Sequence, residues 1–104
     1  MKNKVLHLLD RTITINFVDN VTNEEGRWLF GITEQTASGF TIEVSTKSKE
    51  GKPLAKDAVM ATIKHELFHC ILDTMMYFQE SGNESLVEWL AQASMILSKQ
   101  GVKI

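Results

Sequence analysis

Apolar and polar side chains alternate along the chain between residues 11 and 46. In three stretches every second residue is β-branched or aromatic: Ile13, Ile15 and Phe17; Trp28, Phe30 and Ile32; and Phe40, Ile42 and Val44. A period of two is typical of strands that bury one face. The segments between these stretches are rich in Asn, Asp, Ser and Gly, which favour turns. The pattern therefore predicts a three-stranded antiparallel meander, and residues 4–9 fit either a fourth strand or a short helix.

After a polar loop at residues 47–53, the apolar residues recur at intervals of three and four. This period predicts one helix from about Leu54 to Phe78. A break at residues 81–83 precedes a second apolar stripe, which predicts a helix from Glu84 to about Lys99 with Asn83 or Ser81 as its cap. A connection this short predicts an antiparallel helix pair. Strands followed by helices give an α+β fold: a meander of three to four antiparallel strands, a long helix and an antiparallel closing helix.

Composition narrows the function classes. The 104 residues fit one domain spanning 1–104. Eleven Lys and Arg residues against thirteen Asp and Glu argue against a nucleic-acid partner bound through bulk charge. One cysteine excludes an intramolecular disulfide, and no apolar run approaches the roughly 20 residues of a membrane span. From the N-terminal residues we predict no secretion signal, and we expect a cytoplasmic protein without a membrane partner.

The segment His65-Glu66-Leu67-Phe68-His69 is an HExxH motif inside the predicted long helix. Residues four apart lie on one helical face, so His65 and His69 can bind one ion together. Neutral imidazoles are good ligands for Zn²⁺. Glu66 lies beside the same ion and can act as a general base toward a zinc-activated water. The residues around the motif are mostly uncharged, which suits a helix half buried in a core. The motif predicts a Zn²⁺ site with Glu66 as the catalytic residue.

A catalytic zinc site takes a third protein ligand, and the candidates here are glutamates of the second helix. His69 lies about nine residues before the expected end of its helix, roughly 13 Å along the axis. The second helix must run back a similar distance along the axis to reach His69. Glu88 lies about 6 Å further along this helix than Glu84. We therefore expect Glu88 as the third ligand, with Glu84 as the alternative. The glutamate that does not bind the ion can orient a histidine.

Other titratable residues near the motif fit a metal ligand less well. Asp73 lies on the same helix face as His69, but the straight helix carries it away from the ion. His7 lies in the ambiguous N-terminal segment, far from the motif in the sequence. Cys70 is rotated about 100° from His69 on the helix, and we expect it in the core as a small apolar residue.

An HExxH helix followed by a glutamate on the next helix resembles the gluzincin metallopeptidases. Their aminopeptidase branch typically has 18 residues before the third ligand, as found here between His69 and Glu88. The chain also resembles small phage- and prophage-encoded zinc metallopeptidases, in an HExxH helix at residues 65–73 and a closing helix at 83–99. The resemblance covers about residues 12–99. It implies a minimal zincin-like fold, zinc bound by His65, His69 and a glutamate, and a catalytic Glu66.

The leading hypothesis is a zinc-dependent metallohydrolase, a metallopeptidase that cleaves a peptide or protein substrate. An alternative is a catalytically inactive zinc-binding module, regulatory or protein-binding, of phage or bacterial origin. A metal-free structural protein of a phage or bacterial assembly is a third hypothesis. If the chain is phage-encoded, the cytoplasm is that of the host.

The small size of the chain bears on how a substrate would bind. Full-sized zincins build the far wall of their cleft from a second subdomain, for which 104 residues leave no room. We therefore expect a homo-oligomer or a partner protein to complete the cleft, unless the site is shallow and open. If residues 40–45 form an open edge strand, they could receive an extended peptide; a simple edge or core strand without that role is the alternative. We expect the apolar cluster at residues 75–78 to pack between the helices, with an exposed partner surface as the alternative.

Overall fold

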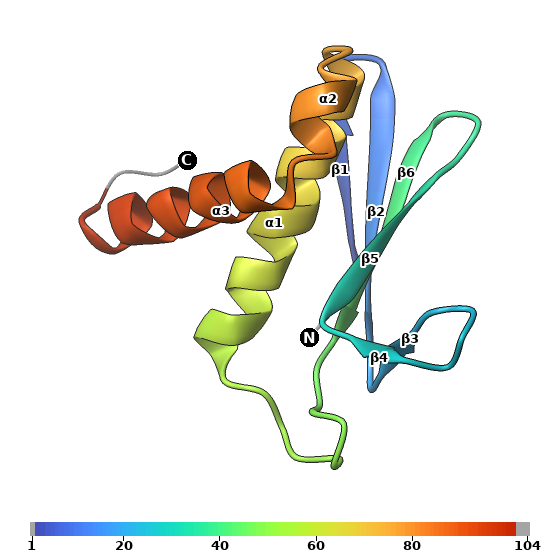
Figure 1. Cartoon of the computed structure of the whole chain (residues 1–104), viewed down its shortest axis with the longest axis vertical. Helices are drawn as coiled ribbons and strands as arrows, with labels where there is room; N and C mark the ends of the chain where they lie inside the picture. The colour runs from blue at the N-terminus through green and yellow to red at the C-terminus, as the bar shows by residue number, and fades with distance from the viewer. Residues whose placement is uncertain (1, 102–104) are drawn as a thin grey trace.

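The strands and helices of the computed structural model form successive layers, shown in Figure 1. The strands are β1 (Lys4–Leu8), β2 (Arg11–Val18), β3 (Val21–Thr22), β4 (Trp28–Leu29), β5 (Gly31–Gln35) and β6 (Gly39–Ser45). The helices are α1 (Lys56–Thr74), α2 (Phe78–Ser81) and α3 (Glu84–Lys99). The structure describes residues 2–101, so residue 1 and residues 102–104 of the expected domain lie outside the described residues. This order of elements confirms the α+β class.

The main sheet has the strand order β1-β2-β6-β5. β1 pairs antiparallel with β2, and β5 pairs antiparallel with β6, but β2 and β6 run parallel. The prediction of a purely antiparallel meander is therefore wrong at the centre of the sheet. Of the two alternatives for residues 40–45, the open edge strand is excluded and the core strand is confirmed, because β6 lies between β2 and β5. The open edges belong to β1, which settles the ambiguity of residues 4–9 as a strand, and to β5.

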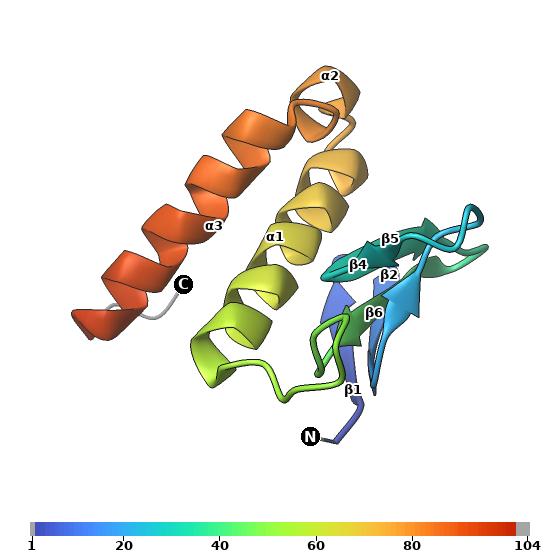
Figure 2. The same ribbon diagram turned by 60° about the horizontal axis from the view of Figure 1, so that its bottom comes forward.

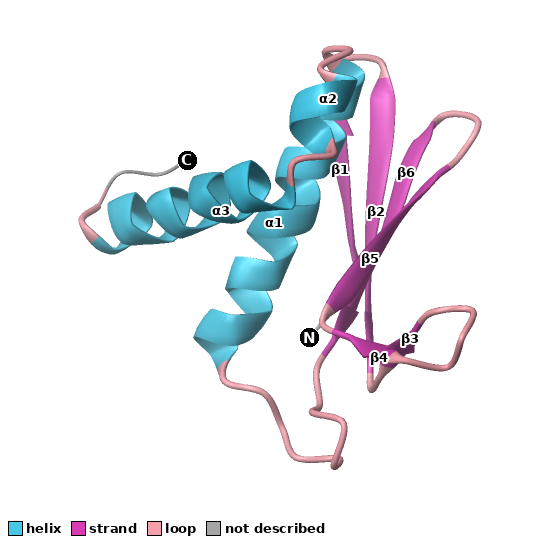
Figure 3. Cartoon of the chain, viewed as in Figure 1, coloured by secondary structure: helices cyan, strands magenta, loops and turns pink. Residues whose placement is uncertain are grey.

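The segment between β2 and β5 explains the unexpected topology. It folds outward as a two-stranded ribbon of β3 and β4, which Figure 3 shows at the end of the main sheet. The stretch expected as one strand around Phe30 is thereby divided into β4 and β5. The buried hydroxyl of Ser45 holds this ribbon: it accepts a hydrogen bond from Val21 N at 2.8 Å and donates to Leu29 O at 2.7 Å. With residues 21–29 used in the ribbon, β5 joins the sheet beyond β6.

The core lies between the main sheet and α1. The alternating apolar residues of β2 and β6 are buried against apolar residues of α1, and the cluster includes Ile13, Ile15, Phe40, Ile42, Val44, Val59, Ile63 and Cys70. Burial of each large aliphatic side chain contributes on the order of 1.5–3 kcal/mol. The core residues predicted from the two periods are thus the ones that join α1 to the sheet, and the helix face beside them carries the HExxH motif.

The helix α1 ends at Thr74, four residues before the predicted end at Phe78. Met75 is the C-cap, and Met76 has a positive φ of 65°, which turns the chain out of the helix. Tyr77 N then donates to Leu72 O at 2.8 Å. The apolar side chains of residues 75–78 are exposed, so the expectation that they pack between the helices is wrong.

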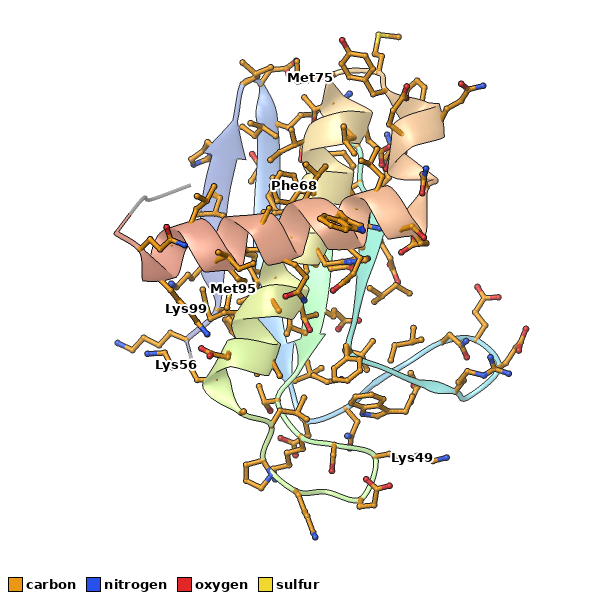
Figure 4. The ribbon with its side chains drawn as sticks, turned by 60° about the vertical axis from the view of Figure 1, so that its left-hand side comes forward. Lys49, Lys56, Phe68, Met75, Met95 and Lys99 are labelled. Carbon is orange, nitrogen blue, oxygen red and sulfur yellow. The ribbon has the colours of Figure 1, made fainter. Side chains whose placement is uncertain are left out.

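The helix α3 packs on the side of α1 that faces away from the sheet, as Figure 2 shows. It runs back toward the start of α1, where Lys99 Nζ lies 2.9 Å from Asp57 Oδ2. Figure 4 shows, however, that α3 crosses α1 obliquely, so the predicted antiparallel pair is only approximate. Asn83 is the cap, as its side chain accepts a hydrogen bond from Leu86 N at 3.1 Å. Within residues 2–101, no helix combines the length and apolar character needed to cross a membrane.

Candidate metal centre

The HExxH motif lies in the middle of α1, with both histidines on the face beside α3. The Nε2 atoms of His65 and His69 are 3.3 Å apart, and their rings meet edge to face at a centroid distance of 5.0 Å. The helical spacing alone produces this arrangement, because residues four apart lie one above the other on the same face of a helix. The structure therefore brings the two predicted histidine ligands together at one point.

The carboxylate of Glu84, in the first turn of α3, reaches the same point. Its Oε2 lies 3.0 Å from His65 Nε2, and its Oε1 lies 3.2 Å from His69 Nε2. One ligand atom from each of the three residues lies within 4.8 Å of the others, so the group could hold a metal ion. Two imidazoles and one carboxylate suit zinc, which is commonly bound by histidine and acidic oxygen ligands.

Glu88, the expected third ligand, lies on the opposite side of the His65 ring. Its Oε2 is 2.8 Å from His65 Nδ1, and its Oε1 accepts a hydrogen bond from Gln92 Nε2 at 2.9 Å. The hydrogen bond from Gln92, supported by His65, lowers the pKa of the Glu88 carboxyl below its usual value. In this position Glu88 is placed to orient His65, the role left for the glutamate that does not bind the ion.

The early end of α1 explains this exchange between Glu84 and Glu88. His69 lies five residues before Thr74, about 7.5 Å along the axis, instead of the roughly 13 Å expected. The chain after α1 therefore has a shorter distance to return along the helix axis, and the first turn of α3 already lies beside the histidines. Glu88, one turn later, lies beside the outer face of His65.

The partners of the two Nδ1 atoms determine which histidine nitrogens are free. A carboxylate only accepts hydrogen bonds, so a proton on His65 Nδ1 would be donated to Glu88 Oε2, 2.8 Å away. The Ser81 hydroxyl lies 3.2 Å from His69 Nδ1 and donates to the His69 carbonyl at 3.4 Å, so it accepts from His69 Nδ1–H. In the tautomer with both Nδ1 atoms protonated, the two Nε2 lone pairs face each other and the Glu84 carboxylate. Three acceptors that converge in this way require a cation or a proton between them, and the donor set therefore fits a metal ion.

Glu66 is buried between α1 and the edge strand β5. Its Oε1 accepts a hydrogen bond from Thr33 Oγ1 at 2.8 Å, and its Oε2 lies 3.9 Å from His65 Nε2. Gly31 lets β5 approach this closely, because a Cβ there would lie 2.7 Å from Thr62 Cγ2. The second carboxylate oxygen of Glu66 is thus held beside the candidate metal position, as the predicted general base requires.

Two hollows flank this centre. A polar cleft of about 500 Å³ opens between β5 and the C-terminal half of α1, where its walls include Thr33, Gln35 and Asp73. A second hollow of about 390 Å³ lies on the other side, between the β4–β5 junction and the N-terminal half of α1. Both are lined by Gly31, His65 and Glu66. The centre therefore lies in a concave surface that residues of this one chain form.

The remaining singled-out residues lie away from the candidate metal position. His7 is exposed on β1. Cys70 is fully buried, as expected, and burial raises the pKa of its thiol to about 12, with the nearby carboxylates of Glu66 and Asp73 adding to the rise.

Sequence reasoning missed two residues that hold the centre in place, Thr33 and Ser81. Thr33 fits the alternating pattern of its strand, so the sequence gives no sign of a special role. Its contact with Glu66 depends on the position of β5 beside α1. Ser81 was a candidate helix cap, and its place just before the second helix was the only signal of a special role.

Comparison with known proteins adds no relative to this picture: no protein-family model, curated protein or solved structure matches the chain.

Proposed function

We propose that this protein is a zinc-dependent metallohydrolase, and that its substrates are peptides. The observation that carries the proposal is the convergence of His65 Nε2, His69 Nε2 and the Glu84 carboxylate beside the buried Glu66. His65, His69 and Glu84 would hold the ion, and Glu88 and Ser81 would fix the histidine rings through their Nδ1 atoms. This assignment exchanges the roles that the sequence spacing suggests for Glu84 and Glu88.

Zinc, when bound there, supplies a Lewis acid that polarises a carbonyl and makes water more acidic. Glu66 supplies the base: its Oε2 takes the proton from the attacking water while Thr33 holds its Oε1. Once the tetrahedral carbon has formed, the protonated Glu66 gives its proton to the departing amine nitrogen, and the carbon–nitrogen bond breaks. Glu66 thus returns to the carboxylate form at the end of each cycle.

The open edge of β5 supports a peptide as the substrate. The hydrogen bonds from Ser45 N to Phe30 O and from Thr36 N to Gly39 O set the alternation of the β5–β6 ladder. The backbone groups of Gly31, Thr33 and Gln35 therefore face away from β6, along the edge beside the polar cleft. An extended peptide can add to this edge as a further strand, with its backbone near Glu66.

Zinc binding and catalysis have separate tests. Chelator-treated protein should take up one equivalent of zinc in a competition titration, and a His65→Ala, His69→Ala double variant should take up none. The metal titration is needed because one protonated imidazole would also satisfy the contacts to Glu84. Wild-type uptake below half an equivalent contradicts the proposal.

Catalysis is tested with a peptide library and mass spectrometry of the products. The wild type should cleave the library, and Glu66→Gln should keep the zinc and lose on the order of 10²–10⁴ in rate. Glutamine retains an oxygen that accepts the Thr33 hydrogen bond, so the site should stay in place. Cleavage by Glu66→Gln at the wild-type rate contradicts the role of Glu66.

A zinc-stabilised binding module without turnover is the second candidate. The link that Glu84 and Ser81 make from α3 and α2 to α1 favours it, since an ion there would fasten the closing helix to the rest of the fold. Such a module should lose stability on chelation and cleave no member of the library.

A further inference from the structure

The second hollow beside the centre differs in chemistry from the polar cleft. Its apolar wall is formed by Leu29, Phe30, Ala58, Ala61 and Thr62, and these residues define the apolar pocket; Gly31, His65, Glu66 and the carboxylate of Glu88 complete its rim. Its volume of about 390 Å³ lies in the range of small-molecule binding sites. A water-exposed hollow with this lining is suited to an apolar group.

The side chains of the apolar pocket are arranged to keep it open and apolar. Ala58 and Ala61 lie one turn apart on α1, so two small residues form the helix side of the pocket. The Thr62 hydroxyl bonds to Ala58 O at 3.0 Å, which leaves its methyl group toward β5, 2.7 Å from an ideal Cβ at Gly31. The hydroxyl of Thr62 is therefore satisfied within the helix, and its methyl group is the part that lines the pocket.

Phe30 forms the strand side of the apolar pocket. It is 52% exposed, a large value for an aromatic residue between two strands. The ring of Trp28 packs edge-on against it, at a centroid distance of 4.6 Å and an interplanar angle of 70°. This contact holds the Phe30 ring in place while leaving much of its surface available to a ligand.

The apolar pocket adjoins the candidate metal centre. Gly31, His65 and Glu66 line both hollows, whereas His69 and Glu84 line only the polar cleft, so the ion would lie in the polar cleft with His65 and Glu66 between it and the apolar pocket. A peptide along the β5 edge advances about 3.3 Å per residue. A residue adjacent to the reacting bond can therefore place its side chain in the apolar pocket.

We propose that the apolar pocket is the specificity pocket of this site and takes a large aliphatic or aromatic side chain next to the cleaved bond. This inference rests on the proposed peptidase function. Ala58 and Ala61 set the size of the accepted side chain, and Phe30 provides its main contact surface. A hydrophobic pocket of this kind discriminates a large from a small side chain on the order of tenfold or more.

The first test measures binding, so it needs no turnover. Two zinc-chelating probes, leucine hydroxamate and glycine hydroxamate, are titrated into the zinc-loaded protein. The leucine probe should bind at least about tenfold more tightly and shift the methyl NMR signals of Ala58 and Ala61. Ala61→Phe, which fills the pocket, should remove the difference. Ala93→Phe, at an exposed alanine of α3, is the matched control and should preserve it.

Equal affinities for the two probes, or a leucine preference that survives in Ala61→Phe, would overturn the inference while zinc binding and the proposed function stand. The second test uses the peptide library. The wild type should prefer Leu, Met or Phe on one side of the cleaved bond, and Ala61→Phe should shift this preference toward Gly and Ala. If zinc does not bind at all, the proposed function fails, and the inference fails with it. If Ala61→Phe does not fold, Ala58→Leu provides the same comparison.

Discussion

The two helices that form the candidate metal centre hold their candidate ligands in different ways. The side chains of His65 and His69 on α1 are 19% and 15% exposed, whereas those of Glu84 and Glu88 on α3 are 70% and 52% exposed. The histidines are held by one continuous helix against the core. The glutamates depend on where α1 ends and how α3 crosses it. Local geometry thus determines one half of the site, and the register between helices determines the other.

The largest effect is expected for the alkylation of Cys70, on the buried side of α1. Cys70 follows His69 and is fully buried, which raises the pKa of its thiol from 9.0 to about 12. A raised thiol pKa keeps the group neutral, so at about pH 8 the reactive thiolate should be on the order of a thousandfold scarcer than in an unfolded chain. Alkylation of chelator-treated protein, native against guanidinium-unfolded, measures this. Equal rates in the two states would mean that α1 is not held against the sheet.

A second comparison separates the two glutamates of α3. Glu84→Gln should weaken zinc binding by more than about a hundredfold, because a metal ligand is lost. Glu88→Gln should weaken it by about tenfold, the usual scale for a residue that orients a ligand. Glu80→Gln removes an exposed charge from α2 and is the matched control. If Glu88→Gln is the more damaging change, the register of α3 described here is wrong.

The next largest effect is expected on turnover, when Glu66 loses its hydrogen bond from Thr33. Thr33→Val removes the hydrogen bond to Glu66 Oε1 and keeps the side-chain volume. Turnover should fall by about tenfold, the scale of one hydrogen bond to a charged group, while zinc affinity stays unchanged. Thr33→Ser keeps the hydroxyl and should restore the rate. A fall in zinc affinity with Thr33→Val would instead indicate that the strand supports the whole centre.

The smallest effect concerns the turn that sets the register of α3. Met76 has a φ of 65°, a left-handed conformation that costs a residue with a side chain about 1–2 kcal/mol. Met76→Gly relieves this cost and loses part of the gain to the greater freedom of the unfolded chain, for a net stabilisation of about 0.5–1 kcal/mol. Urea unfolding measures it, with Met75→Gly, at an ordinary φ of −87°, as the control. Destabilisation by Met76→Gly would contradict the described end of α1.

The same contrast separates what could and could not be predicted from the sequence. The α+β order, the buried residues of β2 and β6, and the meeting of His65 with His69 follow from periods within single elements, and these predictions are confirmed. The parallel pairing of β2 with β6 depends on residues 21–29 folding outward as a separate ribbon. No period within one strand reveals which neighbour that strand will join.

The third ligand is the clearest example. The apolar residues 75–78 continue the helical pattern, so the spacing alone extends α1 past its real end. The left-handed turn at Met76 has no glycine to mark it in the sequence. Because α1 ends four residues earlier than its spacing predicts, Glu84 and not Glu88 lies at the Nε2 atoms of the histidines. Thr33 and Ser81 were missed for a related reason, since their contacts lie between elements.

A crystal structure of the zinc-loaded protein, with an anomalous map recorded at the zinc absorption edge, would identify the ion and its protein ligands. We expect one zinc ion bound by Nε2 of His65, Nε2 of His69 and a Glu84 oxygen at about 2.0–2.2 Å, with Glu88 still on Nδ1 of His65. An ion bound by Glu88 in place of Glu84, or no anomalous peak between the histidines, would contradict it.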